Sequence, residues 1–578
     1  MKYPTLYSKD SSRQIVDVFK GYNHNLRIGD GEFFDMKNMT SDHYPVLSPR
    51  KQRGVYASPD SPTGLIAKDA LCYVEGTKFV INEYPVEMGL NDEPKQLISM
   101  GAYVIILPDK KWVNTLDTTQ HGDIEAGWES TGDVTFSLCT ISGEAYEGAE
   151  ASSTEPKEPK NMQLWIDTSS TPHALKQYSA VSSMWVSIAS TYIKMSAAGI
   201  GKPFGQYDGV TISGVTAKGV DLDGTMVIWE RSDDYIVLAG ILDEVTTQKA
   251  SEGVITVQRT MPQMDYVTEC DNRLWGCKYG MVEGGQVVNE IYACKLGDFK
   301  NWNCFMGLST DSYAAGVGTD GPFTGAVTHL GYPLFFKENC VHKVYGKYPA
   351  NFQIQDTACR GVQKGCHRSL AIVNEILFYK ARSGVMSYDG SLPTESSYAL
   401  GTEAYSNAVG GAHGNKYYIS MADSMGAYHL FVFDTAKGMW HKEDCLPVDC
   451  FCSCDGEMYA ISGGKIITML GSGTSDTDPV KWMVQTGEIG ITSPDMKYIS
   501  RLTVRMSMDI GAEVVIYAQY DFDDEWESVC TLTSTNLRSF SIPIRPKRCD
   551  HMRLRIEGEG MAKIYSITKS IEQGSDIT

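Results

Sequence analysis

The chain has 578 residues, of which 42% are hydrophobic and 21% charged, and its formal net charge is -20. This acidic balance argues against a surface that grips nucleic acid, because such a surface needs clustered lysines and arginines to displace counterions. No apolar run approaches the roughly 18 residues of a membrane-spanning helix, so no membrane span is predicted.

Residues 1–60 are predicted to form an N-terminal arm. The start, Met1-Lys2-Tyr3-Pro4-Thr5, lacks the apolar core of a signal peptide, which predicts folding in the cytoplasm. Glycines and prolines then interrupt the segment, and apolar residues are sparse. A segment with so little core of its own becomes ordered by lying on another surface.

Residues 61–117 are predicted to form a first propeller blade. Strands at 71–74 and 79–81 flank Glu75-Gly76-Thr77-Lys78, which is a hairpin turn signal, and a further strand is expected at 103–108.

Residues 118–262 interrupt the blade pattern. The stretch 143–160 is low in apolar residues and ends in Glu155-Pro156-Lys157-Glu158-Pro159-Lys160, which predicts an exposed loop. Short strands separated by turns follow at 209–214, 226–229 and 254–257. We therefore expect a small, barrel-like β-domain inserted between blades.

Residues 263–479 are predicted to form the remaining blades. An aromatic or apolar strand, a tight turn and a second apolar strand recur from positions 334, 377, 417 and 458, at spacings of 43, 40 and 41 residues. A period near 40 with several strands per unit is typical of propeller blades. With a blade near residue 275 and the one at 61–117, the sequence predicts about six blades.

Residues 480–578 are predicted to form a C-terminal β-sandwich. Leu502, Val504 and Met506 alternate with polar residues, as expected for strands with one buried face and one solvent-exposed face. The predicted fold is therefore all-β: a propeller of about six blades with an inserted barrel-like domain and a C-terminal sandwich.

The glycine spacing at 316–321 matches that of a dinucleotide-binding loop. That mechanism needs a helix N-terminus directly after the glycines. Here Pro322 and Phe323 follow instead, so we expect a loop and no nucleotide site.

A cysteine-rich stretch invites a zinc interpretation; its residues are His441, Cys445, Cys450, Cys452 and Cys454. Alternate spacing puts three of the thiols on one face of a strand, roughly 6.6 Å apart per step. A tetrahedral zinc site needs turn spacing such as Cys-x2-Cys. The 15 cysteines of the chain also lack paired spacing, so we expect reduced thiols that pack as small apolar groups.

An acidic knot precedes Trp526 and consists of Asp521, Asp523, Asp524 and Glu525. It lacks the glycine-containing loop of a calcium site, so a solvated hairpin tip is expected.

Motifs for nucleophilic catalysis are missing from the sequence: there is no Gly-x-Ser-x-Gly elbow, no His-Glu-x-x-His and no kinase set. Paired carboxylates for glycoside cleavage stay open, because they need not be close in sequence. The sequence therefore predicts no catalytic, cofactor-binding or metal-binding residue, no cofactor, and no enzyme.

Four segments resemble the β-propeller tail proteins of tailed bacteriophages, the tail tubular protein B or nozzle group. They are the arm phrase at 29–39, the insert phrase at 204–214, the blade phrase Asn272-Arg273-Leu274-Trp275-Gly276, and the C-terminal phrase at 542–551.

The resemblance implies a structural virion protein that acts in DNA ejection. Such a protein forms a homo-oligomeric ring, here expected to have six copies, in the nozzle or tail-tube conduit. Its partners are the adaptor or portal, other tail proteins and tail fibres, and genomic DNA passes through without specific binding. The expected location is the virion tail, after assembly in the host bacterium.

Two alternatives to the ring remain open at this point. A carbohydrate- or receptor-binding propeller module of the tail predicts exposed aromatic residues on blade loops. A propeller glycosidase predicts clustered carboxylates at the mouth of the central channel.

Overall fold

The structure is a computed structural model that describes residues 11–472, 474–475, 479–493, 495–521 and 523–573. The described residues form strands β1 to β53 and four short 3-10 turns, with no α-helix among them, so the predicted all-β class is confirmed. No described helix is long and apolar enough to cross a membrane. The chain divides into unit 1 (Met1–Lys95, Phe336–Val341 and Thr357–Thr578) and unit 2 (Gln96–Phe335 and His342–Asp356).

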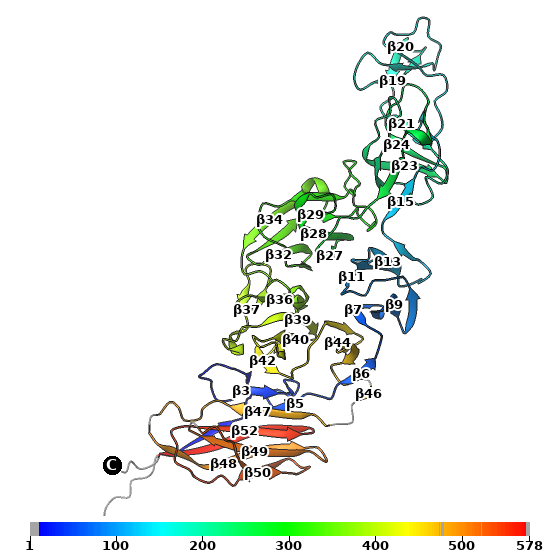
Figure 1. The fold of residues 1–578 in the computed structure, drawn as a ribbon. Coiled ribbons are helices and arrows are strands. Elements are labelled where there is room, and N and C mark those ends of the chain that lie inside the picture. The colour runs from blue at the N-terminus through cyan, green and yellow to red at the C-terminus, as the bar shows by residue number, and fades with distance from the viewer. Residues whose placement is uncertain (1–10, 473, 476–478, 494, 522, 574–578) are drawn as a thin grey trace, which may run out of the picture. The chain divides into compact units, whose positions relative to one another are not determined.

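The described part of unit 1 contains four antiparallel sheets of one kind, in which each strand pairs with the next along the chain (Figure 1). The first is β7 (Pro62–Lys68), β8 (Ala70–Glu75), β9 (Lys78–Ile81) and β10 (Tyr84–Glu87). The second is β35 (Ala371–Val373), β36 (Ile376–Ala381), β37 (Gly384–Tyr388) and β38 (Thr394–Glu395). The third is β39 (Ser406–His413), β40 (Lys416–Ala422), β41 (Tyr428–Asp434) and β42 (Met439–Lys442). The fourth is β43 (Cys450–Cys454), β44 (Glu457–Ser462) and β45 (Lys465–Thr468), completed by β6 (Gly54–Ala57).

The last of these sheets is tied to the start of the chain in two ways. Strand β6, which comes from the arm, pairs with β45 and places Val55 opposite Ile467. Leu65 and Tyr73 of the first sheet share one buried cluster with Ile461 of the last. The first and last sheets of the series therefore lie side by side.

Unit 2 contributes further sheets of the same kind. They are β11 (Gln96–Met100), β12 (Tyr103–Leu107), β13 (Lys111–Asn114) and β14 (His121–Asp123); and β27 (Tyr266–Cys270), β28 (Arg273–Met281), β29 (Val287–Ala293) and β30 (Tyr313–Gly316). A last one, with residues in both units, is β31 (Gly325–His329), β32 (Tyr332–Lys337), β33 (Cys340–Tyr345) and β34 (Gln353–Ala358).

The number of such sheets differs from the roughly six blades that the sequence predicts. Within the described residues seven sheets follow this pattern, since the segment expected as one blade, 61–117, contains β7–β10 and most of β11–β14. The fourth strands explain the error, because they are short and carry no apolar run: β10 reads Tyr84-Pro85-Val86-Glu87 and β14 reads His121-Gly122-Asp123. An outer strand packs on little, so it leaves no periodic signal in the sequence.

The insert between β14 and β27 is built from two sheets. The larger has the order β15 (Ala126–Glu129), β26 (Thr256–Arg259), β22 (Gly209–Ser213), β23 (Gly224–Ser232), β24 (Tyr235–Ala239), β21 (Tyr192–Ser196), β16 (Val134–Cys139) and β25 (Thr246–Gln248). Its core includes Phe136, Met195 and Ile228. The smaller is β17 (Glu150–Ser152), β18 (Leu164–Asp167), β19 (Ala174–Ser179) and β20 (Met184–Ser187). Strand β17 lies inside the stretch expected as an exposed loop.

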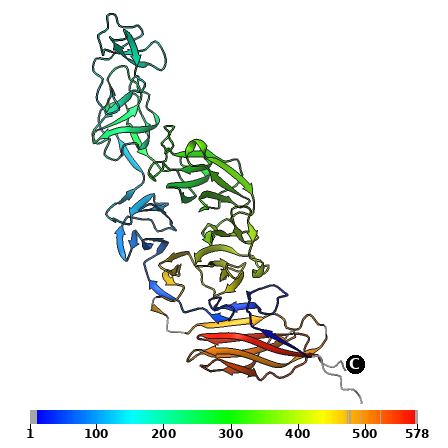
Figure 2. The same cartoon turned by 180° about the vertical axis from the view of Figure 1, so that it is seen from behind.

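The C-terminal part forms two sheets together with the arm (Figure 2). One is β1 (Ser11–Val16), β53 (Ala562–Gln573), β48 (Lys497–Met508) and β51 (Arg538–Ile542). The other continues from β42 through β2 (Gly21–Tyr22), β3 (Glu32–Lys37), β47 (Lys481–Thr486), β52 (Met552–Glu559), β49 (Glu513–Tyr520) and β50 (Glu527–Leu532). Two short pairs also involve the arm: β4 (Met39–Thr40) with β5 (Ser48–Pro49), and β46 (Thr474–Ser475) with β6. Leu502, Val504 and Met506 are buried, as their alternation predicted.

The arm turns sharply at Gly31, and a substitution at this position tests the path of the arm's backbone. Gly31 has φ +89°, and a Cβ there would collide with the carbonyl oxygen of Val18. Gly31→Ala is expected to lower the free energy of unfolding by about 1–3 kcal/mol, the usual cost of a strained backbone position. The matched control is Gly29→Ala, whose Cβ would meet only the end of the Glu32 side chain at 3.5 Å. Equal unfolding midpoints in urea for both variants would contradict this arrangement.

Candidate functional site

A groove of ≈ 760 Å³ opens in unit 2 at the base of the insert. Its walls are the β12–β13 turn, the end of β14, the first and last strands of the insert (β15 and β26), and the β28–β29 hairpin. These segments come from three regions of the sequence, 109–127, 258–263 and 282–292. The fold alone brings them together, so no local motif marks the groove.

The lining of the groove is acidic. Its carboxylates are Asp109, Asp123, Glu125, Glu283 and Glu290, and its cations are Lys110 and Arg259. The Lys110 Nζ lies 2.7 Å from Glu125 Oε1, which also accepts a hydrogen bond from the backbone N–H of Met261 at 3.0 Å. These two contacts fix the position of the Glu125 carboxylate at the start of the insert.

A buried ion pair braces the insert beneath the groove. The side chains of Arg259 and Asp208 form a salt bridge and are each only 8% exposed. Arg259 also donates from Nε to the carbonyl of Ile124 at 3.1 Å, and the amide of Asn301 donates to Asp208 at 2.8 Å. Arg259 lies on β26, Asp208 directly precedes β22, and Asn301 lies in the loop between β29 and β30. Because these bonds join the three segments, the wall of the groove is held rigid.

Tyr292, on β29, gives the groove an aromatic side chain. Burial raises the pKa of its hydroxyl well above the ordinary value, and hydrogen bonding to Glu290 raises it further. The phenol therefore stays protonated at neutral pH and serves as a hydrogen-bond donor toward Glu290. Tyr292 packs against the buried cluster that includes Ile98 and Leu274, and its hydroxyl gives the groove a fixed polar group.

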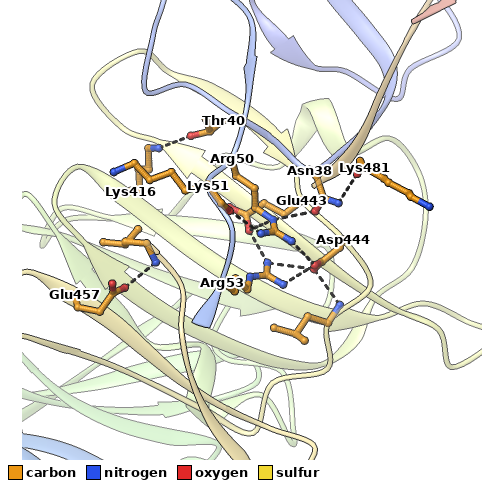
Figure 3. Close-up of polar contacts among 12 residues, drawn as sticks. Asn38, Thr40, Arg50, Lys51, Arg53, Lys416, Glu443, Asp444, Glu457 and Lys481 are labelled. Atoms are coloured by element: carbon orange, nitrogen blue, oxygen red, sulfur yellow. Dashed lines mark hydrogen bonds and ion pairs between the residues drawn. The ribbon is translucent and has the colours of Figure 1, made fainter. Parts of the chain in front are cut away.

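A second charged cluster lies in unit 1, where the arm crosses the sheet β39–β42 (Figure 3). Arg53 lies 2.6 Å from Glu443 and 2.5 Å from Asp444, and Arg50 lies 3.2 Å from Asp444. The side chains of Arg53 and Glu443 are 11% and 7% exposed. We call these four residues the arm clasp. Its charges are matched two against two, so it serves to hold the arm in place.

A cavity of ≈ 370 Å³ lies beside the arm clasp, and its charges are also paired. Lys416 Nζ lies 2.6 Å from Asp42 and donates to the hydroxyl of Thr40 at 3.0 Å. The hydroxyl of Ser41 donates to Asp434 at 2.5 Å. The polar groups of this cavity therefore tie arm to sheet, as those of the clasp do.

The glycine-rich run at 316–321 begins at the end of β30 and leads through a loop to β31. No helix follows it, so the predicted loop is confirmed and the phosphate-binding geometry is not formed.

The cysteine-rich stretch packs between two sheets of unit 1. Cys450, Cys452 and Cys454 lie on β43 and contact the cluster of Leu65 and Tyr73 from the first sheet. Burial raises the pKa of the Cys450 and Cys452 thiols, which disfavours the thiolate that zinc needs. Among the described residues, no group of three or more His, Cys, Asp or Glu side chains is placed to hold a metal ion.

The acidic knot before Trp526 is partly structural. Asp521 accepts hydrogen bonds from the backbone N–H groups of Asp550 at 2.6 Å and His551 at 3.2 Å. Asp523 lies 3.5 Å from Lys547. The knot therefore anchors the link before β52, and its residue 522 lies outside the described residues.

Comparisons with known proteins give weak likenesses only. No family model and no curated protein matches the chain. An exo-β-1,3-galactanase from Phanerochaete chrysosporium has 8% identity over 52% of this chain and 94% of its own, with a TM-score of 0.21. PorZ of the type IX secretion system of Porphyromonas gingivalis has 10% identity over 90% and 82%, with a TM-score of 0.25. The phage phi92 endosialidase has 10% identity over 77% and 69%, with a TM-score of 0.23.

These neighbours correct one expectation from the sequence. The chain was expected not to be an enzyme, yet similar structures include a galactanase and an endosialidase, so that expectation is wrong and is withdrawn. At such TM-scores the likenesses assign no activity to this chain. The phage-tail ring, with its nozzle role, its partners and its virion location, stays a prediction.

Proposed function

We propose that the chain is a carbohydrate-binding β-propeller module whose groove in unit 2 receives a glycan. In this proposal the seven four-stranded sheets are the blades. The packing of the first sheet against the last supports a closed ring. The observation that carries the proposal is the acidic groove with Tyr292 in its wall.

The groove offers the hydrogen-bonding groups that a sugar requires. Carboxylates accept hydrogen bonds from hydroxyl groups, and the lining amides of Gln258, Gln263 and Gln286 both donate and accept. The face of Tyr292 adds an apolar surface against which a sugar ring packs. Five lining carboxylates against two cations repel anionic sugars, so we propose neutral or amino-bearing glycans.

Exposed aromatic side chains provide independent support. Tyr84 begins the outer strand of one sheet and is 75% exposed, Tyr348 follows β33 and is 45% exposed, and Tyr398 follows β38 and is 77% exposed. The carbohydrate-binding alternative predicted aromatic residues of this kind on blade loops.

We also propose that the module belongs to a bacteriophage tail, and this part rests on the resemblance of the four segments alone. Negative-stain images of the purified chain test the ring role against it. Rings with a central hole would favour the conduit, and single particles would favour the binding module.

Loss of Tyr292 is expected to weaken glycan binding most clearly. The full chain is labelled and applied to a printed array of neutral, amino-bearing and sialylated glycans, and affinities of the retained glycans are then measured by calorimetry. Tyr292→Ala is expected to weaken binding by about tenfold or more, as the loss of a stacking face and a buried hydrogen bond implies. The matched control is Phe305→Ala, a 55% exposed aromatic of the same unit outside the groove. Equal affinities for both variants, or retention of sialylated glycans alone, would refute the proposal.

Glu290→Gln separates binding from hydrolysis. The amide keeps the shape of the side chain but cannot act as acid or base. If wild type releases sugar from the bound glycan, Glu290→Gln is expected to lower that rate by about 100-fold while affinity changes by less than about threefold. If wild type releases none, the groove only binds. Sugar release unaffected by the substitution would place hydrolysis outside this groove.

A further inference from the structure

Strand β20 forms one edge of the smaller sheet of the insert, at the end of the insert farthest from β15 (Figure 1). Within the described residues β19 is its only partner strand. Ile188, directly after β20, donates its N–H to the carbonyl of Leu175 at 2.8 Å. Because hydrogen-bonded pairs alternate along an antiparallel ladder, the backbone N–H and C=O groups of Trp185 and Ser187 point away from β19.

The side chains around this edge are apolar and exposed. Met184 is 63% exposed and Val186 is 55% exposed, although both belong to a strand. Val181, in the turn before the strand, is 98% exposed. Met162, beside the start of β18, is 62% exposed. An edge with open backbone groups and apolar side chains is a template for pairing with another strand.

The edge also lacks the charges that protect other edges of this chain. The outer strands β10, β14 and β50 carry Glu87, Asp123 and Glu527. Residues 179–188 carry no charge and no proline, in a chain whose net charge is -20. Charged groups and proline are the usual means of blocking edge pairing. Their absence here indicates an edge that is covered when the protein acts.

We propose that β20 pairs with β20 of a second copy of this chain, and that the two small sheets join across a two-fold axis. With the axis at Val186, Trp185 lies opposite Ser187 of the partner subunit, and their outward backbone groups bond in both directions. The two copies of Val186 then face each other at a position where side chains are closest. The pairing brings no like charges together, which favours a second copy over a charged foreign strand. It gives a dimer of full chains.

Light scattering on the full chain tests this pairing. The wild type is expected to reach twice the monomer mass as its concentration rises, in moderate salt that screens the net charge. Val186→Lys places like charges opposite each other at the axis and is expected to raise the dissociation constant at least tenfold. The matched control is Val254→Lys, a 55% exposed position of the same insert outside the edge, which should dimerise as wild type does. A wild-type monomer at every concentration, or a Val186→Lys dimer as tight as wild type, would overturn the proposal.

Val186→Cys gives a second measurement, whose outcome does not depend on a loss of folding stability. Opposed residues at such a position have Cα atoms about 4.5 Å apart, within the range of a disulfide. Oxidised glutathione serves as the oxidant and takes two electrons and two protons from the paired thiols. A covalent dimer is then expected on a non-reducing gel. Wild type, with its own exposed Cys445, and Val254→Cys are the controls. Equal dimer yields in all three would place the contact elsewhere.

Discussion

Arg53→Met is expected to lower the free energy of unfolding of unit 1 by about 3–5 kcal/mol, because it removes one of the two cations that face Glu443 and Asp444 and leaves Arg50 alone against both carboxylates. Arg53 contacts Glu443 at 2.6 Å and Asp444 at 2.5 Å, and its side chain is 11% exposed. Both contacts raise the pKa of the guanidinium against the opposing effect of burial. Methionine keeps most of the volume of arginine, so the loss reports the missing charge and hydrogen bonds.

Chemical unfolding of the full chain, followed by fluorescence, measures the effect. Lys51→Met is the matched control, because Lys51 lies two residues away on the same segment and its side chain is exposed. It should change the free energy of unfolding by less than about 0.5 kcal/mol. Limited proteolysis should also cut the arm of Arg53→Met sooner than that of Lys51→Met. Indistinguishable variants would mean that the arm clasp does not hold the arm.

The second large effect is a loss of stability in acid that His441 controls. His441 lies on β42 and is 2% exposed, and burial lowers its pKa from 6.5 to about 3. The charge of Lys416 lowers the pKa further, and that of Asp434 opposes the shift. The unfolded chain therefore binds a proton near pH 6.5, and the folded chain does not until about pH 3. Above pH 6.5 His441 is neutral in both states and does not change the free energy of unfolding. Below pH 6.5 the free energy of unfolding falls by about 1.4 kcal/mol per pH unit, because the unfolded chain binds the proton and the folded chain does not.

Unfolding free energies at pH 7, 6 and 5 measure this slope. His441→Asn removes the titrating ring and is expected to reduce the slope by about one bound proton. His367 is partly buried, and burial lowers its pKa to about 4, so a smaller slope of the same sign remains in the variant. His121→Gln, at an exposed position, should leave the slope unchanged. If the free energy of unfolding of His441→Asn depends on pH as steeply as that of wild type, His441 is not buried as a neutral ring.

The inner strands of the four-stranded sheets could be predicted from sequence, and the outer strands could not. Leu334, Phe335 and Phe336 are fully buried on β32, and such apolar runs gave the period near 40 residues. Strands β10 and β14 bury little and carry polar residues, so the sequence left one four-stranded sheet uncounted. The strands that the arm adds to the C-terminal sheets depend on pairing over long sequence distances, as in Val16 opposite Ile567. Local propensity carries no information on such pairs.

The candidate site could not be predicted from sequence for a related reason. Glu125, Arg259 and Tyr292 lie in three segments, and none belongs to a recognisable motif. Local motifs that the sequence did present, such as the glycine run and the cysteine stretch, proved to be a loop and a packing surface. Paired carboxylates could only be left open from the sequence, because they need not be close along the chain. The groove became visible only when the fold placed the base of the insert against the β28–β29 hairpin.

Hydrogen–deuterium exchange of the full chain, with and without the neutral or amino-bearing glycan that binds best on the array, tests the central claim most directly. We expect slower exchange at 109–127, 258–263 and 282–292, the segments that line the groove. These segments should lose their protection in Tyr292→Ala. Protection confined to other segments, such as those around Tyr84 and Tyr398, or the absence of any bound glycan, would contradict the account.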